Sequence, residues 1–167
     1  MSEDAISGAK GFDPKLFTSF ARQVGHGGAL GIHYVDHGAD WVELGLDYDE
    51  KLIGVAATGV IASGPIISLM DMATSMALWV KLNRFQHQAT LDMRVDYLRP
   101  ATPGERIVGR GECYSVTRSV GFVRGIAHDG DPANPVANVA GTFMFTKSWG
   151  NQGDKELRRS SARRSTS

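Results

Sequence analysis

The chain is poor in cysteine, with Cys113 as the single example among its 167 residues. A lone cysteine excludes an internal disulfide and is typical of a reducing compartment. Charge of one sign is also missing, since lysine and arginine together number 18 and so do aspartate and glutamate. This balance disfavours a nucleic acid or a membrane surface as the partner of the domain as a whole.

A targeting segment and a long uninterrupted hydrophobic run are absent as well. No cationic stretch followed by an apolar one opens the sequence, so no signal peptide is predicted. The longest apolar run, residues 62–80, is broken by serine, threonine and Asp71, so it is not predicted to span a membrane. Metal-ligand spacing is not found among the histidines, and no metal site is expected. We therefore expect a cytoplasmic protein.

What remains is enough apolar material for one folded domain. Hydrophobic residues make up 42% of the chain and charged residues 22%, which is ordinary for a protein with a single core. The pattern predicts an N-terminal segment over residues 1–28 with one short helix, a folded domain over 29–148, and a tail over 149–167. Periodicity vanishes in the tail, so we expect it to be disordered.

The N-terminal segment carries clear start and stop signals. Asp13 is a good N-cap and Pro14 suits the first helical position, so a short helix should begin there. The glycines at 25, 27 and 28 are predicted to end it. Two strands around a turn at residues 38–40 follow, and then a loop of small residues over 55–65.

The stretch "ASGPIISLMDMATSMALWV", residues 62–80, predicts one long helix. Ser63 is the N-cap candidate and Pro65 suits the first turn, so the helix should begin near Gly64 and end near Leu82. Apolar residues cover nearly every face, which is typical of a buried helix. Because an unpaired buried carboxylate is costly, Asp71 must be paired, protonated or at a wet site.

The remainder of the chain reads as four strands separated by turns near residues 118–120 and 128–135. These turns are too short for parallel crossovers, so the sheet should be mainly antiparallel. One such sheet must curl around the apolar helix to bury it, which predicts an α+β fold.

In this arrangement the sequence resembles the hotdog-fold acyl-CoA thioesterases, specifically the group related to the phenylacetate-pathway thioesterase. The resemblance covers about residues 42–146 and is carried by "GVIASGPIISLMDMATSMAL", "TLDMRVDYLRPATPGE" and "VANVAGTFMF". It implies a hotdog fold, an antiparallel sheet wrapped around one long central helix. It also implies hydrolysis of an acyl-CoA thioester to coenzyme A and a carboxylic acid. Coenzyme A is then part of the substrate, and no other cofactor is implied.

The family usually opens the central helix with His-Gly-Gly and often has an amide side chain in the preceding loop. Here the histidine position falls on Ala62, the glycine positions fall on Ser63 and Gly64, and no amide stands near Ala56. The helix carboxylate is kept as Asp71. These departures favour an alternative function, a non-catalytic hotdog module that binds acyl-CoA as a sensor or scaffold. A hotdog dehydratase is less favoured, because no histidine lies in or directly before the helix.

Several residues suit thioester hydrolysis. The N–H groups of Ser63 and Gly64 at the positive helix start could polarise the carbonyl, although a plain capping turn has the same sequence. Asp71 is the candidate base or nucleophile, with a structural carboxylate at a helix interface as the alternative. Ser75 lies four residues later on the same face. Thr90 opens the next strand, where relatives often carry a hydroxyl, and we prefer it to Ser75 as a partner of the carboxylate.

Spacing along the helix predicts how such a site is assembled. Ser63 and Asp71 are eight residues apart, roughly 12 Å along the axis at about 1.5 Å per residue. One thioester carbon cannot lie close to both groups of the same chain. If both act, the site combines Ser63 of one subunit with Asp71 of another, which a two-fold homodimer with antiparallel helices provides. The hotdog resemblance implies the same arrangement, in a dimer or a tetramer.

Four arginines at predicted strand ends and turns are candidates for binding the phosphates of coenzyme A. "RPATPGER" holds Arg99 and Arg106, and "TRSVGFVR" holds Arg118 and Arg124. The resemblance implies that loops in these regions flank the nucleotide, and Arg118 is the strongest candidate. Each is otherwise a solvated surface charge.

The sequence does not determine which acyl group the substrate carries. Met70, Met72, Trp79 and Tyr97 could line an aromatic or medium-chain pocket, and core packing explains them equally well. The sequence also leaves open whether Asp71 attacks directly or activates water.

Overall fold

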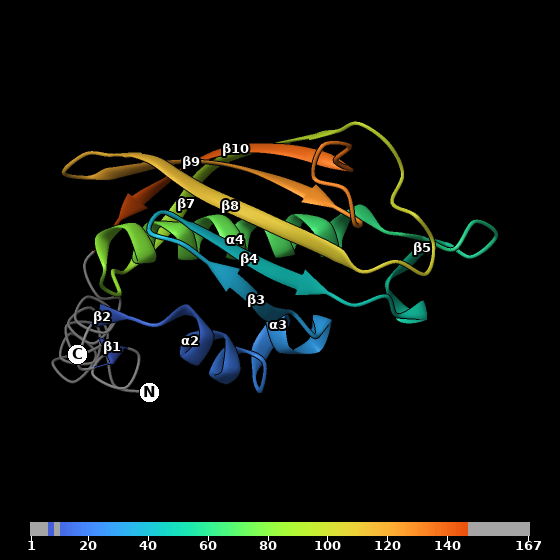
Figure 1. Cartoon of the computed structure of the whole chain (residues 1–167), viewed down its shortest axis with the longest axis horizontal. Helices are drawn as coiled ribbons and strands as arrows, with labels where there is room; N and C mark the ends of the chain where they lie inside the picture. The colour runs from blue at the N-terminus through green and yellow to red at the C-terminus, as the bar shows by residue number, and fades with distance from the viewer. Residues whose placement is uncertain (1–6, 9–10, 147–167) are drawn as a thin grey trace, which may run out of the picture.

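The computed structural model describes residues 7–8 and 11–146 (Figure 1). The helices in this part of the chain are α2 (Pro14–Ala21), α3 (Gly25–Leu30), the 3-10 turn η1 (Glu50–Leu52) and α4 (Ser63–Leu82). The strands are β1 (Ser7–Gly8), β2 (Gly11–Phe12), β3 (His33–His37), β4 (Trp41–Leu46), β5 (Ile53–Val55), β6 (Val60–Ile61), β7 (Gln88–Tyr97), β8 (Ile107–Val116), β9 (Val120–His128) and β10 (Ala137–Phe145). The expected tail over 149–167 lies outside the described residues.

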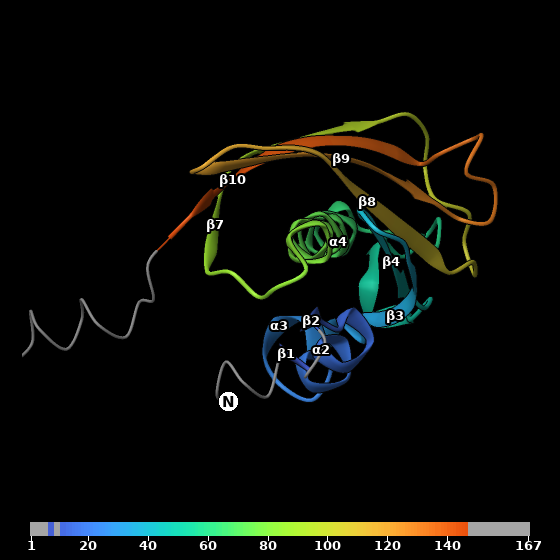
Figure 2. The same cartoon turned by 60° about the vertical axis from the view of Figure 1, so that its left-hand side comes forward.

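Six of these strands form one antiparallel sheet in the order β3-β4-β8-β9-β10-β7. The sheet curves around α4, which runs along its concave face, and α2 and α3 lie on the other side of that helix (Figure 2). The predicted α+β layout, an antiparallel sheet wrapped around one long central helix, is confirmed.

Close contact between α4 and the sheet depends on glycine in β8. A Cβ added at Gly111 would lie 2.6 Å from the backbone of Ala73 and Thr74, so only glycine lets the helix approach this far. The side chains of α4 that face the sheet, among them Leu69, Met70 and Ala77, are fully buried. By length and composition α4 could cross a membrane, but half of it is buried inside this domain, where it is the core helix.

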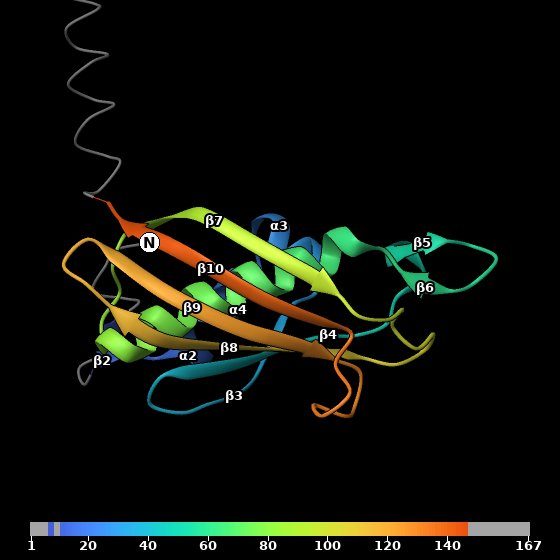
Figure 3. The same cartoon turned by 90° about the horizontal axis from the view of Figure 1, so that it is seen from above.

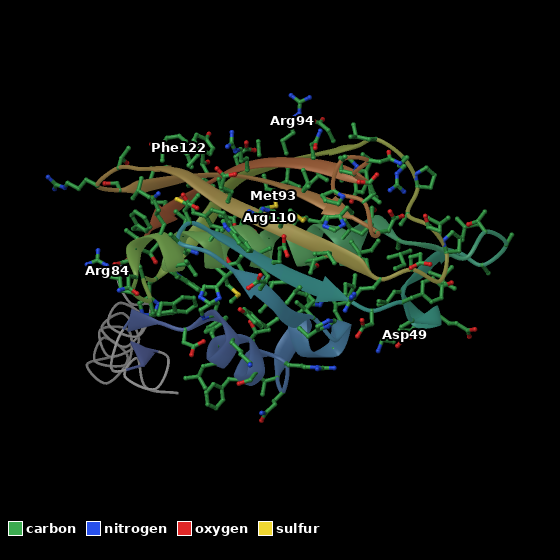
Figure 4. All side chains as sticks on the ribbon, viewed as in Figure 1. Asp49, Arg84, Met93, Arg94, Arg110 and Phe122 are labelled. Atoms are coloured by element: carbon green, nitrogen blue, oxygen red, sulfur yellow. The ribbon has the colours of Figure 1, made fainter. Side chains whose placement is uncertain are left out.

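Strand β7 has one face toward the core and one face away from it, and the alternation is interrupted once near Thr90. Met93 packs against the core, whereas Arg94 points away from the sheet (Figure 4). Leu91 and Tyr97 are 54% and 43% exposed. Leu91 lies at a register shift between β7 and β10, which takes it out of the alternation that places Met93 against the core. In addition, β7 is an edge strand paired only with β10, so this chain leaves part of it uncovered (Figure 3).

The first N-terminal helix begins where it was predicted, and a second helix, which was not predicted, follows it. Asp13 caps α2 by accepting a hydrogen bond from the Leu16 N–H at 3.0 Å. The glycines at 25, 27 and 28 were expected to terminate this helix, and instead they form a second helix, α3. No residue of α3 is buried, and its tie to α4 is a hydrogen bond in which His26 Nε2 lies 3.0 Å from Ser68 Oγ. This tertiary contact opposes the low helix propensity of glycine.

The start of α4 also differs from the expectation. The N-cap is Ala62, Ser63 is already helical, and no side chain caps the helix, so the assignment of Ser63 as the N-cap is wrong. The physical reason is that the Ala62 N–H donates to the Leu52 carbonyl at 2.8 Å, which keeps residue 62 extended. The expected loop before it contains the short hairpin β5–β6.

Candidate active site

Asp71 is tolerated in α4 because it lies on the one side of the helix that this chain leaves partly open. Ile67, Asp71 and Ser75 are spaced by four residues and form a stripe along α4. Ile67 is 41% exposed and the other two are half-buried, while most of the remaining helix is buried. The carboxylate therefore keeps access to solvent and to any molecule that binds along this stripe.

A hydroxyl group from the sheet holds this carboxylate. Thr90 Oγ1 on β7 donates to Asp71 Oδ1 at 2.9 Å. The Ser75 hydroxyl is used differently, since it donates to the backbone carbonyl of Met72 at 3.0 Å. The structure thus brings Thr90 and Asp71 together, while Ser75 lies one turn away on the same wall.

Replacing Thr90 with valine should lower kcat of any reaction that uses the Asp71 carboxylate about tenfold, because a hydrogen bond to a charged group is lost while the shape is kept. Ser75→Ala is the matched control and should change kcat by less than about threefold, since its hydroxyl serves the helix backbone. Steady-state kinetics of both variants measure the difference. Equal effects of the two substitutions would contradict a special role for Thr90.

A pocket of about 580 Å³ opens beside Asp71. Its walls come from α4 and from the two N-terminal helices, and they are mainly apolar, formed by Phe17, Phe20, Val24, Met72 and Trp79. The polar lining includes Asp71, Ser75 and Gln23. A concave, mostly apolar site with a few polar groups at one place is the usual form of a small-molecule site.

No site residue was predicted from the sequence in the N-terminal segment. A sequence signal for its role was nevertheless present, because Phe17, Phe20 and Val24 recur at the spacing of one helical face. In the structure Phe17 packs edge-on against Trp79 with ring centroids 5.0 Å apart, which docks α2 on the end of α4. Of the four residues predicted as possible pocket residues, Met72 and Trp79 line this pocket.

The start of α4 lies in a different depression, of about 350 Å³, lined by Ser63 and Tyr97 among others. The Tyr97 hydroxyl donates to the Ser63 carbonyl at 3.0 Å. Burial raises the pKa of this tyrosine, so it stays protonated and can donate at neutral pH. With no side-chain cap, the N–H groups of Ser63 and Gly64 point out of the first turn.

The two halves of the predicted site are therefore separate within one chain. One 20-residue helix carries both, with Ser63 at its first position and Asp71 eight residues later. Asp71 lines the larger pocket and Ser63 lines the smaller one, and neither residue lines both.

The prediction that Arg99 binds a phosphate of coenzyme A is corrected, because the structure gives this arginine a structural role. Its guanidinium donates to both carboxylate oxygens of Asp129 and to the backbone carbonyl of Asn134. The side chain of Asp129 is only 5% exposed and also accepts from the Thr102 N–H at 2.8 Å. With its donors used in this way, Arg99 joins the loop after β7 to the turn after β9.

Asp129→Asn should lower the melting temperature at pH 7 by roughly 5 to 10 °C, because the nearly buried carboxylate that neutralises Arg99 is removed. The Arg99 guanidinium holds the pKa of the Asp129 carboxyl well below its usual range. A lowered folded-state pKa contributes stability above the unfolded value near about 4 and loses it as pH falls further. The difference between wild type and variant should therefore shrink below about pH 4 in thermal melts. Asp96→Asn, which breaks an exposed pair with Arg94, is the control and should change little.

The other arginines have different surroundings. Arg124 pairs with Glu112 at 2.8 Å and remains largely exposed. Arg106 and Arg118 are exposed, and no ion pair with another described residue involves them. They flank the ten-residue strand β8, roughly 33 Å long at about 3.3 Å per residue, so one phosphate group cannot contact both in one chain. Among the described residues, no group of three or more histidine, cysteine or acidic side chains could hold a metal ion.

Comparison with known proteins agrees with this architecture. Residues 58–136 match the family model of the thioesterase superfamily. A solved protein of Pseudomonas aeruginosa is 36% identical, with a TM-score of 0.69, and the match covers 76% of this chain and 94% of that one. Over residues 58–136 the chain resembles the thioesterase superfamily. This resemblance supports a thioesterase-type function, and the fold described above is a hotdog fold.

Two further proteins of known structure have the same fold at lower identity. A thioesterase from Haemophilus influenzae is 17% identical with a TM-score of 0.72, covering 86% of this chain and 95% of that one. The PaaI protein of the phenylacetic acid degradation operon of Escherichia coli is 15% identical with a TM-score of 0.66, covering 79% of this chain and 93% of that one. No curated protein matches this sequence.

Proposed function

We propose that this protein is an acyl-CoA thioesterase that produces free coenzyme A and a carboxylic acid. The observation that carries the proposal is the Asp71 carboxylate, held by Thr90 at 2.9 Å in the wall of a pocket of about 580 Å³. A carboxylate in this position can remove a proton from water beside a bound thioester, or attack the thioester itself.

The reaction needs a polarised carbonyl as well as a base. The N–H groups of Ser63 and Gly64 would hold the thioester oxygen at the positive end of α4. In the water-mediated route, Asp71 takes a proton from water while the oxygen of that water adds to the carbonyl carbon. The intermediate then collapses, the C–S bond breaks, and the thiolate leaves and is protonated. In the direct route, the Asp71 carboxylate adds to the carbonyl carbon and the C–S bond breaks as the thiolate of coenzyme A leaves. Water then hydrolyses the resulting anhydride, which releases the carboxylic acid and restores Asp71.

Because the two halves are about 12 Å apart on one helix, we propose that each site is shared between two subunits. Two α4 helices that meet antiparallel across a two-fold axis would place Asp71 of each chain beside the helix start of the other. The apolar surface that this chain leaves open supports such a dimer. Ile67 on α4 and Leu91 and Tyr97 on the edge strand β7 are all more than 40% exposed.

For the nucleotide end of the substrate we propose Arg118, and as further candidates Arg106 and Arg124. Arg118 and Arg106 keep free guanidinium groups among the described residues, whereas Arg124 would have to give up part of its pairing with Glu112. Since Arg106 and Arg118 lie at opposite ends of β8, the pair can serve one nucleotide only if they come from different subunits.

The test is a thiol-release assay over a panel of acyl-CoA thioesters, combined with gel filtration. Release of coenzyme A by a particle of at least two chains is the expected result. Tight binding without turnover would favour the second candidate, a sensor or scaffold module, which Ala62 at the family's histidine position supports. A mass equal to one chain would contradict the shared site.

A further inference from the structure

The chemistry of the pocket beside Asp71 restricts the molecule that can fill it. Its lining is apolar except for Asp71, Ser75 and Gln23, and no lysine, arginine or histidine is part of it. Phe20 and Val24 at the pocket are 38% and 70% exposed, although both are large hydrophobic residues. A bound hydrocarbon would cover these side chains, whereas a second carboxylate would be placed near Asp71 without a cation to pair with.

The size of the pocket allows a bulky group. A closed apolar cavity of about 150 Å³ is enough to hold benzene. The pocket here has about 580 Å³, so it accommodates a ring or a branched or extended alkyl group together with the linkage to the thioester. An acetyl group would leave most of this space unfilled.

Three glycines of α3 have different reasons to be glycine. Gly25 has a φ of +69°, which favours glycine. A Cβ at Gly28 would lie 2.6 Å from the backbone oxygen of Arg22, so packing of α3 on α2 requires glycine there. At Gly27 neither reason applies, since the nearest atom to an added Cβ is Met72 Sδ at an ordinary 3.6 Å.

The effect of glycine at position 27 is instead to keep the pocket open. Gly27 and Met72 both line the pocket, one from α3 and the other from α4 beside Asp71. A larger side chain at 27 would extend from the α3 wall toward Met72 and fill part of the space. Such a residue would be favoured by helix propensity, so its absence is not explained by stability.

We propose that the α2–α3 pair selects the acyl group of the substrate, and that Gly27 sets the size limit. The pocket accepts a bulky uncharged hydrocarbon acyl group against Phe17, Phe20 and Trp79, and rejects an acyl group with a terminal carboxylate. This inference rests on the proposed thioesterase function, since it names the substrate class of the same site.

The test compares wild type with Gly27→Leu on benzoyl-CoA, hexanoyl-CoA, acetyl-CoA and succinyl-CoA. Wild type should prefer the two hydrocarbon substrates over acetyl-CoA and succinyl-CoA by at least about tenfold in kcat/KM. Gly27→Leu should lower kcat/KM for the hydrocarbon substrates at least about tenfold and for acetyl-CoA less than about threefold. Gly27→Ala is the matched control with a Cβ at ordinary contact distance, and its losses should be intermediate.

Two further measurements keep the outcome decisive. Phe20→Ala, at a partly exposed position, should reduce the preference for hydrocarbon substrates even if Gly27→Leu does not fold. Binding of the hexyl thioether of coenzyme A, which cannot be hydrolysed, should weaken at least about tenfold in Gly27→Leu. Absence of turnover with all thioesters would overturn the proposed function while the thioether still tests the pocket. Unchanged selectivity and thioether binding in both variants, or preference for succinyl-CoA, would overturn the assignment of the pocket.

Discussion

Asp71→Asn is expected to lower the rate of thiol release by at least about a hundredfold, in the range seen when one general base is removed. Asparagine keeps the size of the side chain, and its Oδ1 can still accept the Thr90 hydrogen bond that Asp71 accepts at 2.9 Å. The substitution therefore removes the charge and the basicity of the group while the local geometry remains. Kinetics with the best substrate of the panel measure the effect as kcat.

Ligand binding by the Asp71→Asn variant is the second measurement, and it complements kcat. Because the pocket walls are unchanged, the Kd of a non-hydrolysable thioether should stay within about threefold of wild type. Asp96→Asn is the matched control, since Asp96 is an exposed carboxylate on the outer face of the same strand that carries Thr90. An Asp71→Asn variant that keeps more than about a tenth of the wild-type rate would show that Asp71 is not the base.

A dimer assembled from two different inactive chains should regain about half of the wild-type activity. The first chain carries Asp71→Asn and the second carries Gly64→Leu. An added Cβ at Gly64 meets no atom of its own chain within 4 Å, so leucine there should be compatible with folding while covering the N–H donors of the first turn. Each variant alone should lose activity by at least about tenfold.

Recovery follows from the shared geometry. In the mixed dimer one site combines the intact helix start of the first chain with the intact carboxylate of the second, and the other site has both defects. Co-expression with two different affinity tags isolates this species, and its specific activity is compared with both parents. A purified mixed dimer with no more activity than its parents would show that each site is built within a single chain.

The sequence was sufficient for much of the fold because the relevant signals are local. Strand alternation, the apolar helix over residues 62–80 and the short turns each depend on neighbouring residues, and these elements lie where they were expected. The predictions failed where contacts with distant residues oppose local preference. Glycine-rich α3 is tied to α4 by the hydrogen bond between His26 and Ser68, and Ser63 is not a cap because the preceding residue is held by Leu52.

The residues of the candidate site also differ in how far the sequence could predict them. Asp71 could be found from the sequence, since a single carboxylate in an apolar helix is an exception that needs a reason. Its partner Thr90 needed the resemblance to a family, because 19 residues separate the two in the chain. Arg99 was misassigned because an arginine in a turn looks the same whether or not a buried carboxylate, 30 residues away, already neutralises it.

By itself, the sequence determined the class of the fold, the central helix and the position of its carboxylate, because hydrophobic periodicity and the cost of burying charge can be read along the chain. Only the tertiary structure decided that α2 and α3 wall the pocket beside Asp71, that Thr90 holds the carboxylate, and that the helix start opens elsewhere. These are contacts between distant segments, and their geometry depends on how the sheet curves around α4 rather than on any local pattern.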